Sequence, residues 1–520
     1  MWSSDFIAKI SLSTTRLHYI MRVVRVGTAP GVVGYLASSL PAHGDPVIGA
    51  RGVSVSGPRL TPRGYSSTLG TCTVALAGEL RELLRAVTRG TFIEIRAGDV
   101  LDHEGQYEVI FVGQVEQITR QGRFQGTLTA RDLLSALRCR PTNDAVDLAL
   151  YADYTGSDTL STAYVVGDAT LVVNSTSGFE KPSIGSGGLR VDNGTDDPFI
   201  LRWSSATATT FTITGTSDNS HGTIREGSPL GSVVDAVFFI EAHPIDAARY
   251  IFTSTGNAYN GVYDILPETW GFGLPDSYID HRDCNDYRTE SLPAMVIELM
   301  LDAQQYDPLG WLQGLLSRLG FYLTCRMGLL TVRAGLMSTR ASTGTSMIAI
   351  SAGRDQISLT EADITSATCN LWDSETSEEY ASLVVISSAV DGTEWDTVSS
   401  QTGDENPATL PALPGLVFDV SDLVFTGSTD TRENILGRAW EIAQRVPESY
   451  MFTLAGLRAA VLAPGDFIRV TSNRVAGRIT TTIDGLNDCR MVVTQIETDY
   501  SGGRVTLSAL VYPTSGSVFP

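Results

Sequence analysis

The alternation of hydrophobic and polar positions predicts that this chain is built mostly of strands. In Cys72–Leu76, apolar and polar residues take turns, as they do in a strand with one buried face. Similar β-rich runs lie near both ends of the chain: Tyr19–Val26, Thr91–Arg96, Tyr107–Ile118 and Phe124–Ala130 at the beginning, and Tyr450–Leu457, Phe467–Thr471, Arg490–Ile496 and Val505–Leu510 at the end. We therefore expect a mainly β protein with some α, of the α+β class.

A few stretches have apolar residues at helical spacing instead. They are Glu79–Val87, a short helix opened by Pro244, Leu292–Gln304 capped by Ser291, Leu309–Leu319 after Asp307-Pro308, and Thr431–Val446 capped by Asp430. The third and fourth of these precede two strand-like runs, Phe321–Cys325 and Leu329–Arg333. Met327-Gly328 lies between those runs, so a hairpin is expected there.

The stretch Leu462–Val470 combines a turn with a strand. Pro464-Gly465-Asp466 is a turn triplet, because proline presets the backbone angle, glycine accepts a positive one and aspartate bonds back to the main chain. Strand-like runs lie on both sides of the triplet. We expect a hairpin that enters a β-barrel or sandwich.

The chain is too long for one ordinary core, and its composition changes along its length. We predict four units: residues 1–143, mainly β; 144–239, an inserted small β-sandwich or barrel rich in Ser, Thr and Gly; 240–345, mixed helix and hairpin; and 346–520, β with helix 431–446. Thr402–Pro414 contains three prolines and is predicted to be an exposed linker.

The insertion contains aromatic residues that allow two interpretations. Tyr151, Tyr154, Tyr164 and Trp203 are candidates for stacking on sugar rings if they are exposed. The other interpretation places Trp203 in the core of a decorating domain. The aromatics form no recognisable stripe, which favours the second interpretation.

Composition narrows the function classes. The net charge of −21 and the lack of a Lys/Arg cluster argue against a nucleic-acid-binding face. The acidity fits a surface that nucleic acid passes without sticking, or simply a soluble acidic protein. The six cysteines are scattered without a CxxC pair, so buried free thiols are expected rather than a metal cluster. No apolar run is long enough for a membrane segment, and cytoplasmic synthesis is expected.

Catalytic signatures are missing from the sequence. It contains no nucleophile elbow, phosphate-binding loop, zinc-protease motif or dinucleotide fingerprint. His281-Arg282-Asp283 matches a kinase triplet without the other kinase motifs. Asp355, Glu361 and Asp363 are acidic neighbours without the spacing of a calcium loop. We expect no enzyme activity, no catalytic residues, no metal site and no cofactor.

Four stretches carry a resemblance to one protein family. LAPGDFIRV contains Pro464, Gly465 and Asp466; EVIFVGQVEQI followed by GTLTARDLLSAL contains Phe111, Gly113, Val115, Asp132, Leu133 and Leu134; AHPIDAARYIFTSTGNAYNGVYDILPETWGFGLP contains His243, Pro244, Trp270 and Gly271; and GWLQGLLSRLGFYLTCRMGLLTVRAG is a helix, strand, glycine turn and strand. Together they resemble the tail hub, or baseplate hub, of long-tailed phages and gene transfer agents. We expect the named residues to be structural.

The resemblance implies a structural virion protein at the phage tail tip, assembled in the host cytoplasm. It implies two tail-tube-like β-barrel domains per subunit and a homotrimer that mimics a sixfold tube. The implied partners are the distal tail protein ring, the tape measure protein and the tail-tip or fibre proteins, and DNA would pass through the lumen without specific binding. Some relatives carry a cluster on closely grouped cysteines, a pattern from which this sequence departs.

Two other functions stay open at this point. The first is a carbohydrate-binding or cell-wall-degrading tail protein that acts through the 144–239 insertion. The second is a cellular β-rich adhesin, which the lack of a secretion signal disfavours.

Overall fold

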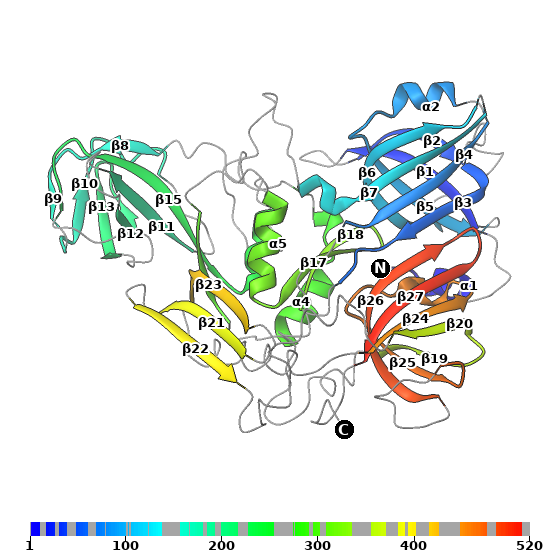
Figure 1. Cartoon of the computed structure of the whole chain (residues 1–520). Helices are drawn as coiled ribbons and strands as arrows, with labels where there is room; N and C mark the ends of the chain where they lie inside the picture. The colour runs from blue at the N-terminus through cyan, green and yellow to red at the C-terminus, as the bar shows by residue number, and fades with distance from the viewer. Residues whose placement is uncertain are drawn as a thin grey trace.

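A computed structural model describes residues 2–511 apart from 11–16, 26–30, 39–47, 61–68, 79, 100–101, 103–105, 123, 138–155, 166, 180–184, 193–198, 217–226, 254–273, 275, 291–294, 302–307, 335–354, 371–382, 391–393, 402–414, 426–447 and 476–484. Within these residues the protein is mostly β, with two large sheets and two two-stranded ones. Figure 1 shows the large sheets in separate lobes. Between them lie α4 (His281–Glu290), α5 (Pro308–Arg318), β17 (Phe321–Arg326) and β18 (Leu329–Ala334).

The larger sheet joins the two ends of the chain. In spatial order its strands are β2 (Gly31–Ser38), β1 (Leu17–Arg25), β5 (Phe92–Asp99), β6 (Glu108–Arg120), β7 (Gln125–Asp132), β4 (Thr71–Ala77), β3 (Ile48–Ser56), β26 (Leu486–Asp499), β27 (Arg504–Val511), β24 (Glu448–Ala455) and β20 (Ile364–Asn370), with β25 (Phe467–Ser472) on β26 and β19 (Asp355–Leu359) on β25. The link is the antiparallel β3–β26 pair, in which Ser54 lies opposite Asp499 and Ser56 opposite Glu497. One hydrophobic core contains side chains from both halves.

The predicted alternation is confirmed in this sheet. In β4, Cys72, Val74 and Leu76 are buried while Thr73 is exposed. Because side chains of a strand point alternately to its two faces, this pattern puts one face of β4 in the core. Each predicted β run near the two ends of the chain overlaps a strand of this sheet.

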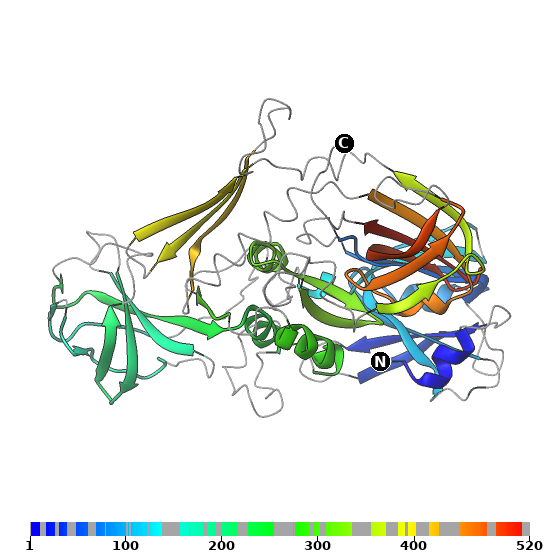
Figure 2. The same cartoon turned by 90° about the horizontal axis from the view of Figure 1, so that it is seen from below.

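The second large sheet contains the insertion and continues beyond it. Its order is β10 (Thr170–Val172), β13 (Thr210–Thr216), β12 (Phe199–Ala206), β11 (Gly185–Asp192), β15 (Val233–Ala242), β16 (Ile297–Leu301), β23 (Gly415–Phe425), β21 (Leu383–Val390) and β22 (Glu394–Gln401), with β8 (Ser157–Thr159) also on β15; β9 (Tyr164–Val165) and β14 (Gly227–Ser228) form their own pair. Figure 2 shows the yellow β21–β23 strands turned away from the green strands of the insertion. Leu189, Leu201 and Phe211 lie in a separate core inside the lobe.

Short helices and one hairpin fill the centre. α3 (Pro244–Thr253) and α5 begin with the predicted prolines, and Gly320, with φ of 78°, follows the end of α5. The predicted β17–β18 hairpin is confirmed. Met327 and Gly328 both have positive φ there, as the tight hairpin turn requires. In the described part of the chain, no helix is both long and apolar enough to cross a membrane.

The predicted helix Leu292–Gln304 is wrong. Its centre is strand β16, which pairs with β15 on one side and β23 on the other. The run is apolar almost throughout, so its periodicity does not distinguish a helix from a buried strand. The run forms a strand because its backbone can pair with the edges of β15 and β23.

The hairpin predicted around Pro464-Gly465-Asp466 is also wrong. The strands before and after the triplet, β24 and β25, are not neighbours. β24 pairs with β20 and β27, whereas β25 pairs with β19 and β26. The short helix η7 (Arg458–Val461) and the triplet carry the chain from one strand to the other. The turn therefore connects separate parts of the sheet.

Several predictions fall on residues outside the described ranges. These are helix Thr431–Val446, the linker Thr402–Pro414, the Trp270-Gly271 turn and the tyrosines Tyr151 and Tyr154. The four-unit division stays a prediction. Sheet pairing crosses its predicted boundaries, because β16 and β21–β23 extend the sheet of the insertion and β3 joins β26.

Candidate functional site

The Pro464-Gly465-Asp466 turn is held tightly to its neighbours in the sheet. The Asp466 side chain accepts a hydrogen bond from Ala463 N at 2.7 Å, the local return bond expected of a turn aspartate. Gly465 N donates to Val493 O at 2.7 Å, and Val493 N donates to Asp466 O at 2.9 Å. Gly465 has φ of 88°, a conformation that favours glycine.

A buried arginine connects this turn to the centre of the molecule. Arg333 of β18 is 0% exposed. Its Nη1 donates to Pro464 O at 3.0 Å and to Asp466 Oδ1 at 3.1 Å. Its Nε and Nη2 donate to the two carboxylate oxygens of Asp283 in α4, at 2.7 and 3.1 Å. The planar guanidinium thus bridges two carboxylates from distant parts of the chain, with bidentate geometry to one of them.

Charge in this buried cluster is balanced by a second arginine. Arg326 Nη1 lies 3.6 Å from Asp283 Oδ1, and its Nη2 donates to Val461 O at 3.2 Å. Burial would raise the pKa of the Asp283 carboxyl, but the charges of Arg333 and Arg326 outweigh it and hold that pKa below its ordinary value. Two arginines and two aspartates therefore meet at one place, which we call the arginine junction (Asp283, Arg326, Arg333, Asp466).

Tyr322 completes the contact between the hairpin and the turn. Its hydroxyl donates to Pro464 O at 2.7 Å, and the whole side chain is buried. A Cβ added at Gly465 would lie 2.0 Å from that hydroxyl oxygen. Glycine is required here both for its backbone angle and for this close approach.

The second stretch of the resemblance meets the same hairpin. Phe111 is buried, and a Cβ added at Gly113 would lie 1.9 Å from Arg131 O, so these positions serve close packing of β6. Asp132 accepts a hydrogen bond from Gly70 N at 2.7 Å. The helix η3 (Leu133–Leu137) then packs on β17 and β18.

The third stretch arrives from the opposite lobe. His243 is buried, and its Nδ1 accepts a hydrogen bond from Ile245 N at 3.2 Å at the start of α3. Its ring stands edge-on to Phe321 of β17, with ring centres 5.3 Å apart. The prediction that His243 caps or packs the helix opened by Pro244 is confirmed. Asp466, His243 and η3, which come from three different stretches of the resemblance, thus all contact the β17–β18 hairpin.

The two candidate sugar-binding aromatics that the structure describes, Tyr164 and Trp203, are buried. Trp203 is 7% exposed and Tyr164 3%, and both belong to the core of the insertion lobe. A Cβ added at Gly187 would lie 2.3 Å from the Trp203 ring, which shows how closely the indole covers that glycine. The favoured interpretation, with Trp203 in the core of the lobe, is confirmed, and Tyr164 lies in the same core, because the lobe needs the large apolar area of these side chains.

The arginine junction was missed at the sequence level, where Asp466 was singled out only for its turn. Asp283 belongs to the His281-Arg282-Asp283 triplet, which was set aside with the kinase interpretation. Arg333 follows Leu329, Leu330 and Val332 in a strand whose one other polar residue is Thr331. A buried charge requires a partner, so an arginine in such a run indicates a buried ion pair without identifying the partner.

His281 begins α4 in a confined polar position. Its Nδ1 lies 3.4 Å from Arg249 Nη2, and its Nε2 lies 3.5 Å from Asp276 Oδ1. Burial, and then the positive charge of Arg249, lower the pKa of His281 to about 4. The ring is therefore neutral near pH 7 in the folded protein.

Acidification should destabilise the fold through His281. Because the folded pKa of about 4 lies below the ordinary 6.5, the unfolded state takes up the proton first. This contribution to stability is present above pH 6.5 and is lost as the pH falls towards 4. Asp276 acts in the opposite direction, since burial raises its pKa. We expect the Tm of the wild type to fall more steeply than that of His281→Gln across this window. Parallel Tm curves would refute the assignment.

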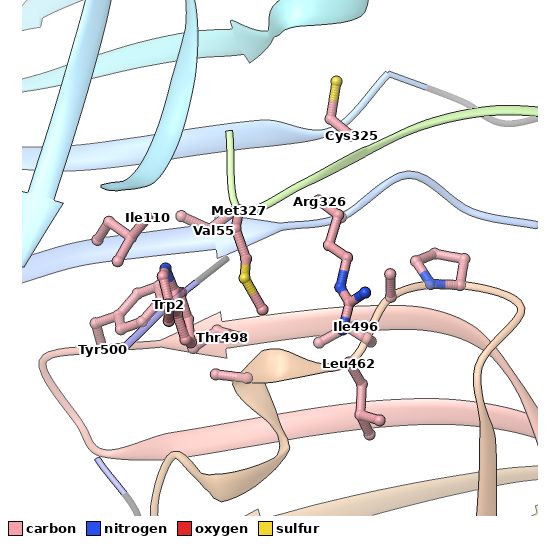
Figure 3. A pocket seen from close by; sticks show the side chains of 14 residues that line it. Trp2, Val55, Ile110, Cys325, Arg326, Met327, Leu462, Ile496, Thr498 and Tyr500 are labelled. Atoms are coloured by element: carbon pink, nitrogen blue, oxygen red, sulfur yellow. The ribbon is translucent and has the colours of Figure 1, made fainter. Parts of the chain in front are cut away.

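One small cavity and the distribution of possible metal ligands can be described around the arginine junction. One cavity of about 60 Å³ lies beside the arginine junction, lined by residues including Trp2, Met327 and Tyr500 (Figure 3). Ligand pockets usually measure about 300–1,000 Å³. No group of three or more His, Cys, Asp or Glu residues suited to a metal occurs among the described residues. The Glu361 carboxylate is bonded to Ser472 Oγ at 2.7 Å and to Arg474 Nε at 2.6 Å.

The described cysteines have free thiols. Cys72 and Cys284 are buried, as expected, and Cys325, Cys369 and Cys489 are partly exposed. Burial raises the pKa of the Cys284 thiol to about 11. Such a protonated thiol is a poor nucleophile and a poor metal ligand near pH 7.

Comparison with known proteins gives tail and virion components. No protein-family model and no curated protein matches the chain. The chain is similar to prophage tail protein gp18 from Listeria monocytogenes EGD-e, with a TM-score of 0.32 and 6% identity over 96% of each chain. It is also similar to a chain of the native gene transfer agent virion, with a TM-score of 0.18 and 14% identity. That match covers 45% of this chain and 83% of the other. A third similar chain belongs to the p2 virion baseplate in its activated conformation, with a TM-score of 0.24 and 9% identity. That match covers 96% of this chain and 100% of the other. TM-scores this low do not establish a shared fold.

Proposed function

We propose that this chain is a structural protein of a phage tail, and specifically the hub at the tail tip. The observation that carries the proposal is the convergence of the hub-like stretches on one hairpin. Asp466 meets Arg333, His243 meets Phe321, and η3 packs on β17 and β18. Stretches of the resemblance that are far apart in the sequence therefore contact the same hairpin in the fold.

The architecture suits a connector better than a catalyst. Asp132, His243 and Asp466 are buried, and their polar groups bind other parts of the same chain. A centre of this kind would hold the two sheet lobes in a fixed relation, as the proposed position between a tube and a tip requires. In the proposed assembly, three copies would each contribute two β units around a channel.

The proposed partners follow from the position in the tail. The distal tail protein ring and the tape measure protein would contact the hub from above, and tail-tip or fibre proteins from below. DNA would leave through the channel. The net charge of −21 disfavours retention of a polyanion on the hub surface.

The carbohydrate-binding alternative has no specific observation in its favour. Two of its four candidate aromatics, Tyr164 and Trp203, are core residues of the lobe. The insertion is better described as a decorating lobe, joined to the rest of the protein through β15 and β16.

Cryo-electron microscopy of intact particles tests the proposal. We expect three copies at the tail tip, ringed around the channel, and antibody labelling of the protein at the same end. A second antibody against the tail tube protein provides the control for accessibility. Absence of the chain from purified particles, or its presence only at fibre ends, would refute the hub assignment.

A further inference from the structure

The helix α1 (Ser4–Ile10) lies across the seam between the two halves of the larger sheet. Trp2, Phe6 and Ile10 follow one another at intervals of four residues, so they share one face of the segment. All three are buried, and the rings of Trp2 and Phe6 meet edge to face at 5.1 Å. This face is part of the core that serves both halves.

Polar contacts fix the same segment to both sides of the seam. On the N-terminal half, Trp2 Nε1 donates to Val109 O at 2.6 Å, and Ser3 N donates to Glu108 Oε1 at 2.9 Å. Lys9 forms an ion pair with Asp102. On the C-terminal half, Ile10 O accepts a hydrogen bond from Leu457 N at 3.3 Å.

The seam itself is narrow. β3 and β26 pair over three residues, from Ser54–Asp499 to Ser56–Glu497. Single backbone bonds extend it, such as Gly57 N to Ile496 O at 2.7 Å and Tyr500 N to Val53 O at 3.0 Å. Neighbouring strands within each half pair over longer stretches, such as the seven residue pairs of β4 and β7.

The same segment also lines the cavity beside the seam. Its lining combines Trp2 with Val55 and Ile110 from the N-terminal half and Ile496 and Tyr500 from the C-terminal half. Figure 3 shows Trp2 beside Tyr500, with Met327 from the hairpin next to them. Loss of the Trp2 side chain would enlarge an existing void at the point where the halves meet.

We propose that residues 2–10 are a clasp that locks the two halves of the larger sheet against hinge motion at the β3–β26 seam. With the clasp in place, the seam amides are shielded and the halves move as one body. Without it, the three-residue pairing opens readily while each half keeps its own strands. This inference concerns the chain alone and does not depend on the proposed function.

Hydrogen–deuterium exchange of the full chain tests the clasp. In Trp2→Ala, and to a smaller extent in Trp2→Phe, amides of residues 53–60 and 494–500 should exchange about tenfold faster or more, because local opening governs their protection. Amides of β12 in the insertion and of β6 away from the seam should keep their rates. Ala8→Ser changes an exposed position of the same helix and should behave as wild type.

Each other outcome overturns the proposal. Unchanged exchange at the seam in Trp2→Ala would show that the segment does not restrain it. A uniform increase across both halves in Trp2→Ala and in the milder Trp2→Phe would make the segment an ordinary part of the core. An increase at the seam in Ala8→Ser equal to that in Trp2→Ala would separate the effect from the buried face.

Discussion

Replacing Arg333 with methionine should lower the free energy of unfolding by about 3–5 kcal/mol, the usual loss when a buried ion pair loses one partner. The methionine fills much of the space but leaves Asp283 and Asp466 buried. Asp283 keeps only Arg326, at 3.6 Å, as a cationic partner among the junction residues. Urea unfolding followed by tryptophan fluorescence measures the loss.

A surface ion pair provides the matched control. Arg469 and Asp488 lie 2.6 Å apart with side chains 36% and 63% exposed, so Arg469→Met should change stability by about 1 kcal/mol or less. Adding Asp283→Asn and Asp466→Asn to Arg333→Met should recover part of the loss, because both buried charges are then removed. Equal losses in Arg333→Met and Arg469→Met would contradict the assigned role.

Replacing Gly465 with valine should cost about 3 kcal/mol or more. Part of this is the left-handed backbone, which costs a residue with a Cβ about 1–2 kcal/mol. The rest comes from steric overlap, because the new Cβ would lie 2.0 Å from the Tyr322 hydroxyl oxygen. That hydroxyl is buried and cannot move away without losing its hydrogen bond to Pro464 O. Stability and particle yield should fall together.

Gly456 separates the two contributions to that loss. It has a similar φ of 79°, but a Cβ there meets nothing within 4 Å. Gly456→Val should therefore show the backbone cost alone. In a Tyr322→Phe background, the nearest ring carbon lies 3.2 Å from the added Cβ, so Gly465→Val should be less harmful than in the wild type. Normal stability and normal particle yield of Gly465→Val would show that the turn is not critical.

Much of the local structure could be predicted from the sequence because its causes are local. Alternation in Cys72–Leu76 follows from the geometry of a strand. Pro244 and Pro308 mark helix starts, since proline lacks the amide hydrogen that a first helical turn leaves unpaired. The role of Gly465 as a turn glycine follows from its neighbours Pro464 and Asp466. His243 was correctly placed at a helix start for the same kind of reason.

What the sequence determined by itself was thus the mainly β character and the positions of many strands and helix starts. Tertiary structure decided which of these meet. Arg333 finds Asp283 from 50 residues away and Asp466 from 133, and no local pattern encodes such a pairing. The β16 run became a strand because β15 and β23 offered it partners on both sides. Trp203 went into the core because its lobe is small and large apolar side chains must be buried somewhere.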